Sequence, residues 1–179
     1  RIWIDDSTMQ QVGNYFKSNT HYMNVTPGNR KVDIKLSKTN ELLSSMQQEI
    51  LPGKKYSLYA LDSQNKFTSL LIPDERLPDD EKRAQLRIVN ILSTNEIINM
   101  EMDKMKIFNP LNFKSATAYQ YCTPGEKRIS IFNDNDKESK ILDNVLIYLD
   151  PGVVYTLYIN GFANAVGTYG PDAILVVNH

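Results

Sequence analysis

Phe16-Lys17-Ser18, followed by Thr26-Pro27-Gly28, returns later in the chain as Phe113-Lys114-Ser115 followed by Thr123-Pro124-Gly125. Both parts of this phrase recur at the same spacing of 97 residues. A phrase that keeps its internal spacing over such a distance indicates a tandem duplication whose period is near the size of one small domain. The repeat therefore predicts the fold and the domain arrangement, while it says little about chemistry.

A second pair of matching segments extends the duplication toward the C-terminus. Pro52-Gly53 leads into Tyr56-Ser57-Leu58-Tyr59, and Pro151-Gly152 leads into Tyr155-Thr156-Leu157-Tyr158 at a spacing of 99 residues. Copy two therefore carries two extra residues between its Pro-Gly pairs. We expect three parts along the chain: a first repeat at residues 1–73, an acidic and proline-containing linker at 74–84, and a second repeat at 85–179.

The hydrophobic pattern predicts strands in both copies. Lys31 to Leu36 alternates strictly between polar and apolar side chains, which places Val32, Ile34 and Leu36 on one buried face. About seven short strands per copy, with turn signals every 8 to 12 residues and no convincing helix, are typical of an immunoglobulin-like sandwich. We therefore expect an all-β chain of two tandem immunoglobulin-like antiparallel β-sandwich domains. The predicted strands are 1–5, 20–25, 31–36, 41–51, 55–61, 67–72, 85–90, 97–103, 116–122, 127–132, 141–149, 153–160 and 173–177, and residues 7–14 are expected to form a loop.

One segment has a helical alternative. Glu41 to Leu51 contains good helix formers, but its counterpart in copy two, Ile141 to Leu149, is rich in Val, Ile and Tyr and favours a strand. Because duplicated segments should share a fold, both are predicted to be strands.

The composition argues against two classes of protein. The 179 residues include 20 basic and 21 acidic side chains, for a formal net charge of −1. This balance lacks the basic surplus that binding to a phosphate backbone requires, so we expect no nucleic acid partner. No apolar run approaches the roughly 20 residues of a membrane-spanning helix. The single cysteine cannot form an internal disulfide, so packing must stabilise the fold.

A resemblance to a known family adds to this interpretation. Leu86-Arg87-Ile88-Val89-Asn90, the Thr123-Pro124-Gly125 turn, and Pro151-Gly152 before Tyr155 to Tyr158 resemble a bacterial envelope domain of unknown function that often occurs in tandem in exported lipoproteins and adhesion proteins. The resemblance implies an exported protein of the cell envelope, at the outer membrane or surface, with a lipid anchor upstream of Arg1. It implies no catalytic residues.

Three residues are candidates for catalytic groups. Cys122 aligns with Val25, an apolar strand position, at the 97-residue spacing, which favours a packing role over a reactive thiol. His21 aligns with Ala118, and His179 is the last residue given. Neither histidine is a good candidate for a general base. We therefore expect no catalytic residues, and a hydrolase or metal-dependent enzyme is the third choice of function.

One acidic stretch partly matches a calcium loop. Asp134, Asp136 and Glu138 have the alternating oxygen spacing of such a loop, but Ser139 and Val145 occupy the positions of the turn glycine and the bidentate glutamate. A solvated hairpin tip explains the stretch better, so we expect no metal and no other cofactor.

Two tyrosines at duplicated positions are the candidate binding residues. Tyr59 and Tyr158 have the opposite strand parity to Tyr56 and Tyr155, and exposed tyrosines can stack on sugars or on protein partners. This predicts a non-catalytic envelope protein that binds a glycan or protein ligand. The alternatives are that these tyrosines are covered, or that the chain is an assembly subunit of a surface fibre or complex.

The repeat spacing also predicts a missing strand. The first strand of copy two, Leu86 to Asn90, has its equivalent in copy one before Arg1. An unpaired sheet edge exposes backbone donors and acceptors and favours pairing with another strand. Residues upstream of Arg1, a strand donated by a neighbouring molecule, or Arg1 to Asp5 moved into the vacant place could fill it.

Overall fold

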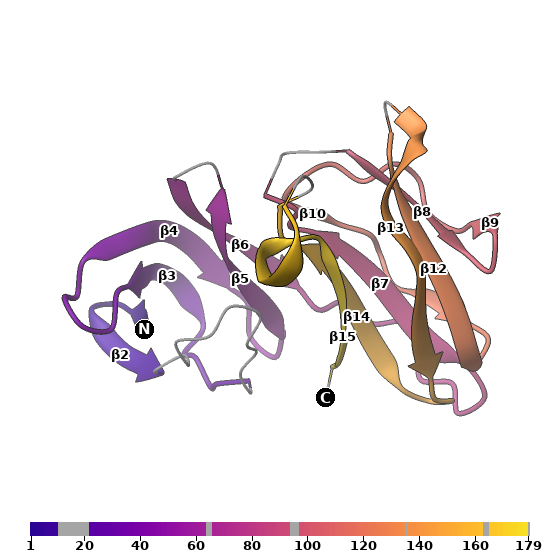
Figure 1. Ribbon diagram of the computed structural model, residues 1–179. Coiled ribbons are helices and arrows are strands. Elements are labelled where there is room, and N and C mark those ends of the chain that lie inside the picture. The colour runs from indigo at the N-terminus through magenta and orange to yellow at the C-terminus, as the bar shows by residue number, and fades with distance from the viewer. Residues whose placement is uncertain (11–21, 64–65, 94–96, 135, 163–164, 179) are drawn as a thin grey trace. The chain divides into compact units, whose positions relative to one another are not determined.

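The computed structural model shows two compact units, unit 1 at Arg1–Asp74 and unit 2 at Glu75–His179 (Figure 1). It describes the chain except for residues 11–21, 64–65, 94–96, 135, 163–164 and 179. Each unit is built from β-strands that form more than one sheet. Among the described residues, no helix is long and apolar enough to cross a membrane.

Unit 1 contains two antiparallel sheets. The four-stranded sheet has the order β2-β1-β3-β4, and the two-stranded sheet pairs β5 with β6. The strands are β1 (Ile2–Ile4), β2 (Ser7–Gln10), β3 (Gly28–Lys35), β4 (Leu42–Ile50), β5 (Tyr56–Ser63) and β6 (Lys66–Pro73). The alternation predicted from the sequence places Val32 and Ile34 of β3 in the interior, where both are buried together with Ile2 and Leu61. Leu36, predicted to be on the same buried face, is instead 41% exposed because it follows the last residue of β3.

Unit 2 contains a four-stranded sheet with the order β13-β12-β8-β9 and a five-stranded sheet. In the five-stranded sheet β7 lies between β14 and the short strands β10 and β11, and β15 forms the other edge beside β14. The strands are β7 (Ala84–Asn90), β8 (Ile98–Met102), β9 (Met105–Lys106), β10 (Ser115–Ala116), β11 (Gln120–Cys122), β12 (Gly125–Asn133), β13 (Asp136–Leu149), β14 (Val154–Asn160) and β15 (Asp172–Val177), and a short 3₁₀ helix spans Gly167–Tyr169.

The core of unit 2 lies between its two sheets. Leu86 and Ile88 of β7 and Leu157 of β14 meet Ile129 and Ile131 of β12, and each of these side chains is at most 1% exposed. Burial of a branched aliphatic side chain contributes about 1.5–3 kcal/mol, so this cluster is the main stabilising element of the unit.

The two units share a four-stranded sheet and a two-stranded hairpin. The sheet β2-β1-β3-β4 matches β9-β8-β12-β13 strand for strand, and the hairpin β5–β6 matches β14–β15. The repeated phrases mark equivalent turns, because Gly28 and Gly125 open β3 and β12 with φ of 116° and 106°. Only glycine adopts this conformation without strain, which explains the repeated glycine. The prediction of an all-β chain with two related domains is confirmed, and the immunoglobulin-like detail stays a prediction.

Several strand predictions are corrected by the structure. Ser7 to Gln10 form a strand rather than a loop, because Asp5 and Asp6 make a tight turn with positive φ at both residues. Tyr22 to Val25 are not in a strand, while the rest of the segment predicted there lies outside the described residues. The predicted strand from Ala116 to Cys122 is two short strands, β10 and β11, because both pair with the single strand β7. Glu41 to Leu51 does contain the strand β4, as the duplication predicted.

Candidate binding site

The two units differ at one sheet edge. In unit 2 strand β14 has neighbours on both sides, with β15 antiparallel and β7 parallel to it (Figure 1). Its counterpart β5 pairs with β6, and within the described part of the chain no strand lies against its other edge. Strand β1 does not fill this place, because it pairs with β2 and β3, so Arg1 to Asp5 is excluded as one of the three possible sources of the strand.

The hydrogen bonds of the β5–β6 hairpin show which backbone groups point toward this edge. Asp74 N donates to Lys55 O at 2.8 Å, one position beyond the Tyr56–Pro73 pair. Bonded and non-bonded pairs alternate along an antiparallel ladder, so the N–H and C=O groups of Tyr56, Leu58 and Ala60 point away from β6. Pro73 fits this assignment, because it lacks an N–H and sits opposite Tyr56 in a non-bonded pair.

The equivalent backbone groups of β14 bind β7. Gln85 N donates to Val153 O at 3.0 Å, and Ile91 N donates to Ile159 O at 2.9 Å. On the other side of β14, Asn178 N donates to Val154 O at 2.8 Å. Alternate residues of β14 therefore bind β7 and β15 in turn. At the 99-residue spacing Leu157 corresponds to Leu58, so the groups that bind β7 in unit 2 are the ones that point to the open edge in unit 1.

A buried polar cluster lies beside this parallel pair in unit 2. Arg87 of β7 is 1% exposed, and its Nε donates to Thr156 Oγ1 at 2.8 Å. Thr156 in turn donates to Asn178 Oδ1 at 2.8 Å, and the guanidinium lies 4.9 Å from the centre of the Tyr119 ring. The cluster combines charge-assisted hydrogen bonding with a cation–π contact, which holds the buried arginine in place.

Unit 1 contains the matching residues. Tyr22 corresponds to Tyr119 and Ser57 to Thr156 at the two repeat spacings, and Asp74 pairs with β5 as Asn178 pairs with β14. Tyr22 Oη donates to Asp74 Oδ2 at 2.5 Å, and Ser57 Oγ donates to the same carboxylate at 3.0–3.1 Å. Asp74 is buried, and Lys55 Nζ lies 5.3 Å from the Tyr22 ring centre. At the 97-residue spacing, the position equivalent to Arg87 lies before Arg1.

Neither of the two tyrosines predicted as exposed binding residues is fully exposed. Tyr158 is 7% exposed, so the expectation that it faces solvent is wrong. The reason is that β14 is a central strand whose seven residues are all buried. Burial, with Asp172 nearby, raises the pKa of Tyr158. Tyr59 is half-buried on β5, and its binding role stays a prediction.

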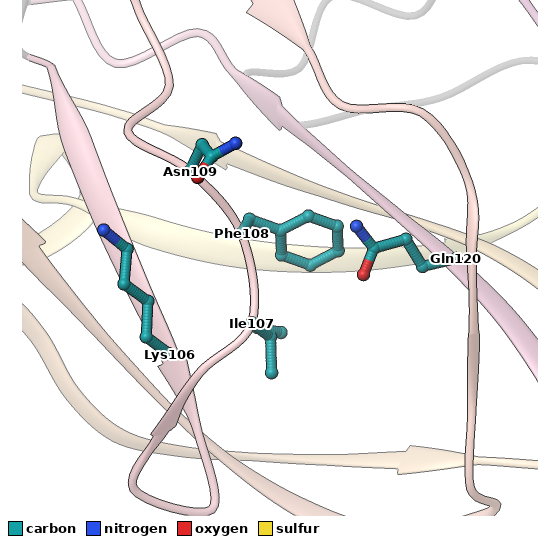
Figure 2. Close-up of a pocket in the computed structure, with 5 residues that line it drawn as sticks. All are labelled: Lys106, Ile107, Phe108, Asn109 and Gln120. Carbon is teal, nitrogen blue, oxygen red and sulfur yellow. The ribbon is translucent and has the colours of Figure 1, made fainter.

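Unit 2 also has an open pocket of about 290 Å³ between the segment after β9 and strand β11 (Figure 2). It is lined by Lys106, Ile107, Phe108, Asn109 and Gln120. Figure 2 shows the Phe108 ring, from the segment after β9, directed toward the side chain of Gln120 in β11. The lining contains the cationic side chain of Lys106 and the amide side chains of Asn109 and Gln120. Its apolar part includes Phe108, which is 6% exposed. The pocket is open to solvent, so it encloses little of any molecule that enters it.

Of the residues with a possible role in catalysis or metal binding, the structure describes the side chains of Cys122 and Asp134. Cys122 is half-buried against the core of unit 2, and burial raises the pKa of its thiol. His21 and His179 lie outside the described residues. Asp134 accepts a hydrogen bond from Asn99 Nδ2, whereas the side chains of Asp136 and Glu138 are not described. In the described residues no group of three or more His, Cys, Asp or Glu side chains could hold a metal ion.

The sequence interpretation missed the set formed by Tyr22, Ser57 and Asp74. The signal was present, because Tyr22 and Ser57 have polar counterparts in Tyr119 and Thr156 at the repeat spacings. Asp74 was assigned to the linker, since its neighbours are acidic and proline-rich. Its backbone bond to Lys55 places it instead in the last rung of the β5–β6 hairpin.

Comparison with known proteins identifies the family. The model described as "Domain of unknown function (DUF4397)" matches residues 2–97 and again residues 84–176. Comparison with curated proteins gave no match. Among solved structures, the C-terminal domain of AlgF from P. aeruginosa is similar, with a TM-score of 0.40 and 17% identity over 54% of this chain and 99% of that one. The chain belongs to the DUF4397 family, whose model it matches twice in tandem.

Proposed function

We propose that the chain is a non-catalytic binding protein of the bacterial cell envelope, and that its ligand is an extended segment of a protein. The ligand adds as a strand to the open edge of β5, a mode of recognition in which backbone hydrogen bonds provide the affinity. The envelope location rests on the resemblance of the repeat to domains of exported proteins.

The observation that carries the proposal is the difference between β14 and β5. The two strands occupy equivalent places in the two copies, and the same alternate residues direct their backbone groups away from the hairpin partner. Strand β14 pairs with β7 as well as with its hairpin partner, whereas β5 lacks a second strand in the described part of unit 1.

A glycan ligand is less well supported. The two tyrosines predicted to stack on a sugar ring are not fully exposed, because Tyr158 is 7% exposed and Tyr59 is half-buried. The other alternative, an assembly subunit, uses the same β5 edge with a second copy as the partner, and the experiment below separates it from binding to a different protein.

The test is selection of displayed random peptides of about ten residues on the full chain, followed by a binding measurement with two variants. Ala60→Pro removes an N–H that points to the open edge, and it spares the hydrogen bonds between β5 and β6. Ala60→Ser keeps the N–H and serves as the matched control. We expect selected peptides to bind the wild type and Ala60→Ser, and to lose at least about tenfold in affinity for Ala60→Pro.

Peptides that bind all three proteins equally would place the ligand elsewhere and contradict the proposal, as would a selection that yields no binder. Sedimentation of the chain alone provides the second arm. Concentration-dependent dimers that disappear in Ala60→Pro would show that the edge binds another copy of the chain, and would favour the assembly subunit.

A further inference from the structure

We propose that the β8–β9 hairpin of unit 2 docks on an anionic lipid surface. The ammonium groups of Lys104 and Lys106 contact the phosphates of the lipid head groups, and the side chain of Met105 between them enters the apolar layer below. This surface is separate from the edge of β5, so it does not depend on the function proposed above.

The hairpin has a fixed shape and lies at the edge of a sheet. Strand β9 is the last strand in the order β13-β12-β8-β9, and it pairs with β8 (Figure 1). Asp103 N donates to Arg128 O at 2.8 Å, and Arg128 N donates to the Asp103 carboxylate at 3.0 Å. The backbone and the side chain of Asp103 therefore both hold the turn against β12, and residues 104–106 project from a turn that is already ordered.

One apolar side chain of the hairpin lies in solvent. Met102 of β8 is 5% exposed in the core of unit 2, whereas Met105, which lies opposite it on β9, is 67% exposed. A methionine side chain is flexible and polarizable, so it suits a binding surface that is not itself rigid. Binding that removes Met105 from water gains from the hydrophobic effect.

The two lysines beside Met105 carry charges that the fold does not use. Both are exposed, and neither forms an ion pair with a residue that the structure describes. The carboxylate of Asp103 is already engaged, at 3.3 Å from Lys127 Nζ. Glu101 lies opposite Lys106 in the hairpin register, but these two described residues form no ion pair. The lysines complement the phosphates of lipid head groups, which a lysine binds as a compact point charge.

Neutral hydrogen-bond donors lie beside Lys106. Asn109 and Gln120 share with Lys106 the open pocket of Figure 2, and their amide groups can donate to an oxygen of the same head group. A head group is held in place by its own bilayer, so it requires no enclosing cavity. The openness of the pocket is therefore compatible with a lipid head group.

Unit 1 has the same turn with a different surface. The turn is Asp5-Asp6, with φ of 48° and 65°, where unit 2 has Asp103-Lys104 with φ of 51° and 66°. The next two residues are Ser7-Thr8 in unit 1 and Met105-Lys106 in unit 2. Turn formation and strand pairing therefore do not explain why residues 104–106 are basic and apolar.

A lipid surface accounts for the apolar residue as well as for the two cations. An acidic protein segment would pair with the lysines, but its charged groups would not cover Met105. At a bilayer the two kinds of side chain reach different depths, because a lysine keeps its ammonium at the head groups while an apolar side chain goes deeper. A basic residue near an anionic membrane contributes about fivefold to affinity, so we expect weak, reversible and salt-sensitive binding.

The experiment measures binding of the full chain to lipid vesicles by co-sedimentation. One set of vesicles is phosphatidylcholine with about one third phosphatidylglycerol, and the other is phosphatidylcholine alone. We expect binding to the anionic vesicles only, and loss of this binding when the salt concentration is raised to about 0.5 M. Equal binding to both sets of vesicles would overturn the proposal.

Substitutions of the lysines locate the site. Lys104→Ala and Lys106→Ala should each weaken binding to anionic vesicles about fivefold, and the double variant about 25-fold. Lys82→Ala removes another exposed lysine of unit 2 and is the matched control, for which we expect no change. Unchanged binding of the double variant, with circular dichroism showing that each protein is folded, would overturn the hairpin as the site.

Met105→Ser separates a lipid surface from an acidic protein partner. We expect it to weaken binding to anionic vesicles by about three- to tenfold, because the apolar contribution is lost. Equal affinity of Met105→Ser and the wild type for the vesicles would overturn the choice of lipid, as would binding to a short polyglutamate peptide without binding to vesicles. Ala60→Pro should bind vesicles like the wild type, and a loss of binding in this variant would overturn the separation from the β5 edge.

Discussion

At the scale of single residues, the two units share a turn that is stabilised by one aspartate. Asp5 and Asp6 in unit 1, and Asp103 and Lys104 in unit 2, have φ between 48° and 66°. These values fit the two-residue turn that follows the right-handed twist of a hairpin. The first aspartate of each turn accepts a hydrogen bond from the backbone N–H of the neighbouring strand at 3.0 Å, from Lys31 and from Arg128.

The aspartate in the turn predicts an acid-dependent loss of stability. The hydrogen bond from the Arg128 N–H and the ion pair with Lys127 lower the pKa of Asp103 below its usual value. A carboxyl whose pKa is lowered on folding stabilises the protein above its unfolded pKa near 3.8, and this contribution is lost as pH falls through the folded pKa. We expect Asp103→Asn to lower the Tm of unit 2 at pH 7 by about 2 °C, with no difference from the wild type near pH 2.

Calorimetry between pH 2 and 7 checks this prediction. Asp79→Asn is the control, since exposed Asp79 has no hydrogen bond or ion pair to a described residue. A difference between Asp103→Asn and wild type that stays constant over the whole pH range would contradict the role of the charge.

At the scale of elements, a bulge interrupts the longest hairpin of unit 2. Ile129 is opposite Val145 but Ile131 is opposite Leu142, so Asp143 and Asn144 together face Ser130. Asn144 has φ of 58°, and the Ser130 hydroxyl donates to Asp143 and accepts from Asn144 N. The bulge therefore needs a residue that tolerates the left-handed conformation.

This conformation predicts opposite effects for two substitutions of Asn144. A β-branched residue costs about 1–2 kcal/mol in the left-handed region, whereas glycine adopts it freely. We expect Asn144→Val to lower the free energy of unfolding of unit 2 by about 1–2 kcal/mol and Asn144→Gly to change it by less than about 0.5 kcal/mol. Urea denaturation measures both, and equal stability of the two variants would show that the bulge is not strained.

The elements that could be predicted from the sequence are those with a duplicated pattern. Strand β4 would be a helix on propensity alone, and its counterpart β13 made the strand prediction right. Strand β2 was missed because a turn of two non-glycine residues has no strong sequence signal. The repeat spacing predicted that copy one lacks its first strand but did not indicate that β5 is the strand beside it. The set of Tyr22, Ser57 and Asp74 needed the hairpin register, which depends on backbone bonds rather than on composition.

At the scale of the whole molecule, each unit contains one natural probe. Trp3, the single tryptophan, is in unit 1, and Cys122, the single cysteine, is in unit 2. The half-buried thiol has a raised pKa in folded unit 2, so we expect its labelling to become faster when the unit unfolds. Tryptophan fluorescence and thiol labelling can therefore follow the two units separately.

Two glycine substitutions test whether the units unfold independently. A Cβ at Gly161 would lie 2.2 Å from Gly170 O, and φ there is 95°, so Gly161→Ala should lower the labelling midpoint of Cys122 by roughly 10 °C or more. A Cβ at Gly53 meets no atom within 4 Å, and φ there is 68°, so Gly53→Ala should cost about 1 kcal/mol in unit 1 alone. We expect each substitution to shift only the probe in its own unit.

Thermal melts with both probes on each variant give the result. If Gly161→Ala also lowered the midpoint of Trp3 fluorescence by the same amount, the two units would unfold as one cooperative body.

The parallel pairing of β7 with β14 has a consequence for synthesis of the chain on the ribosome. β7 is the first strand of unit 2 to emerge, and its partner β14 is made only after the six intervening strands. At a translation rate of roughly 5–20 residues per second, β7 waits for several seconds with Leu86 and Ile88 uncovered on that side. Unit 1 needs no such delayed closure, because its described strands pair with near neighbours in sequence. Until β14 is made, the nascent chain has a folded unit 1 and an incomplete unit 2 with exposed apolar side chains. This is the interval in which a chaperone would be needed most.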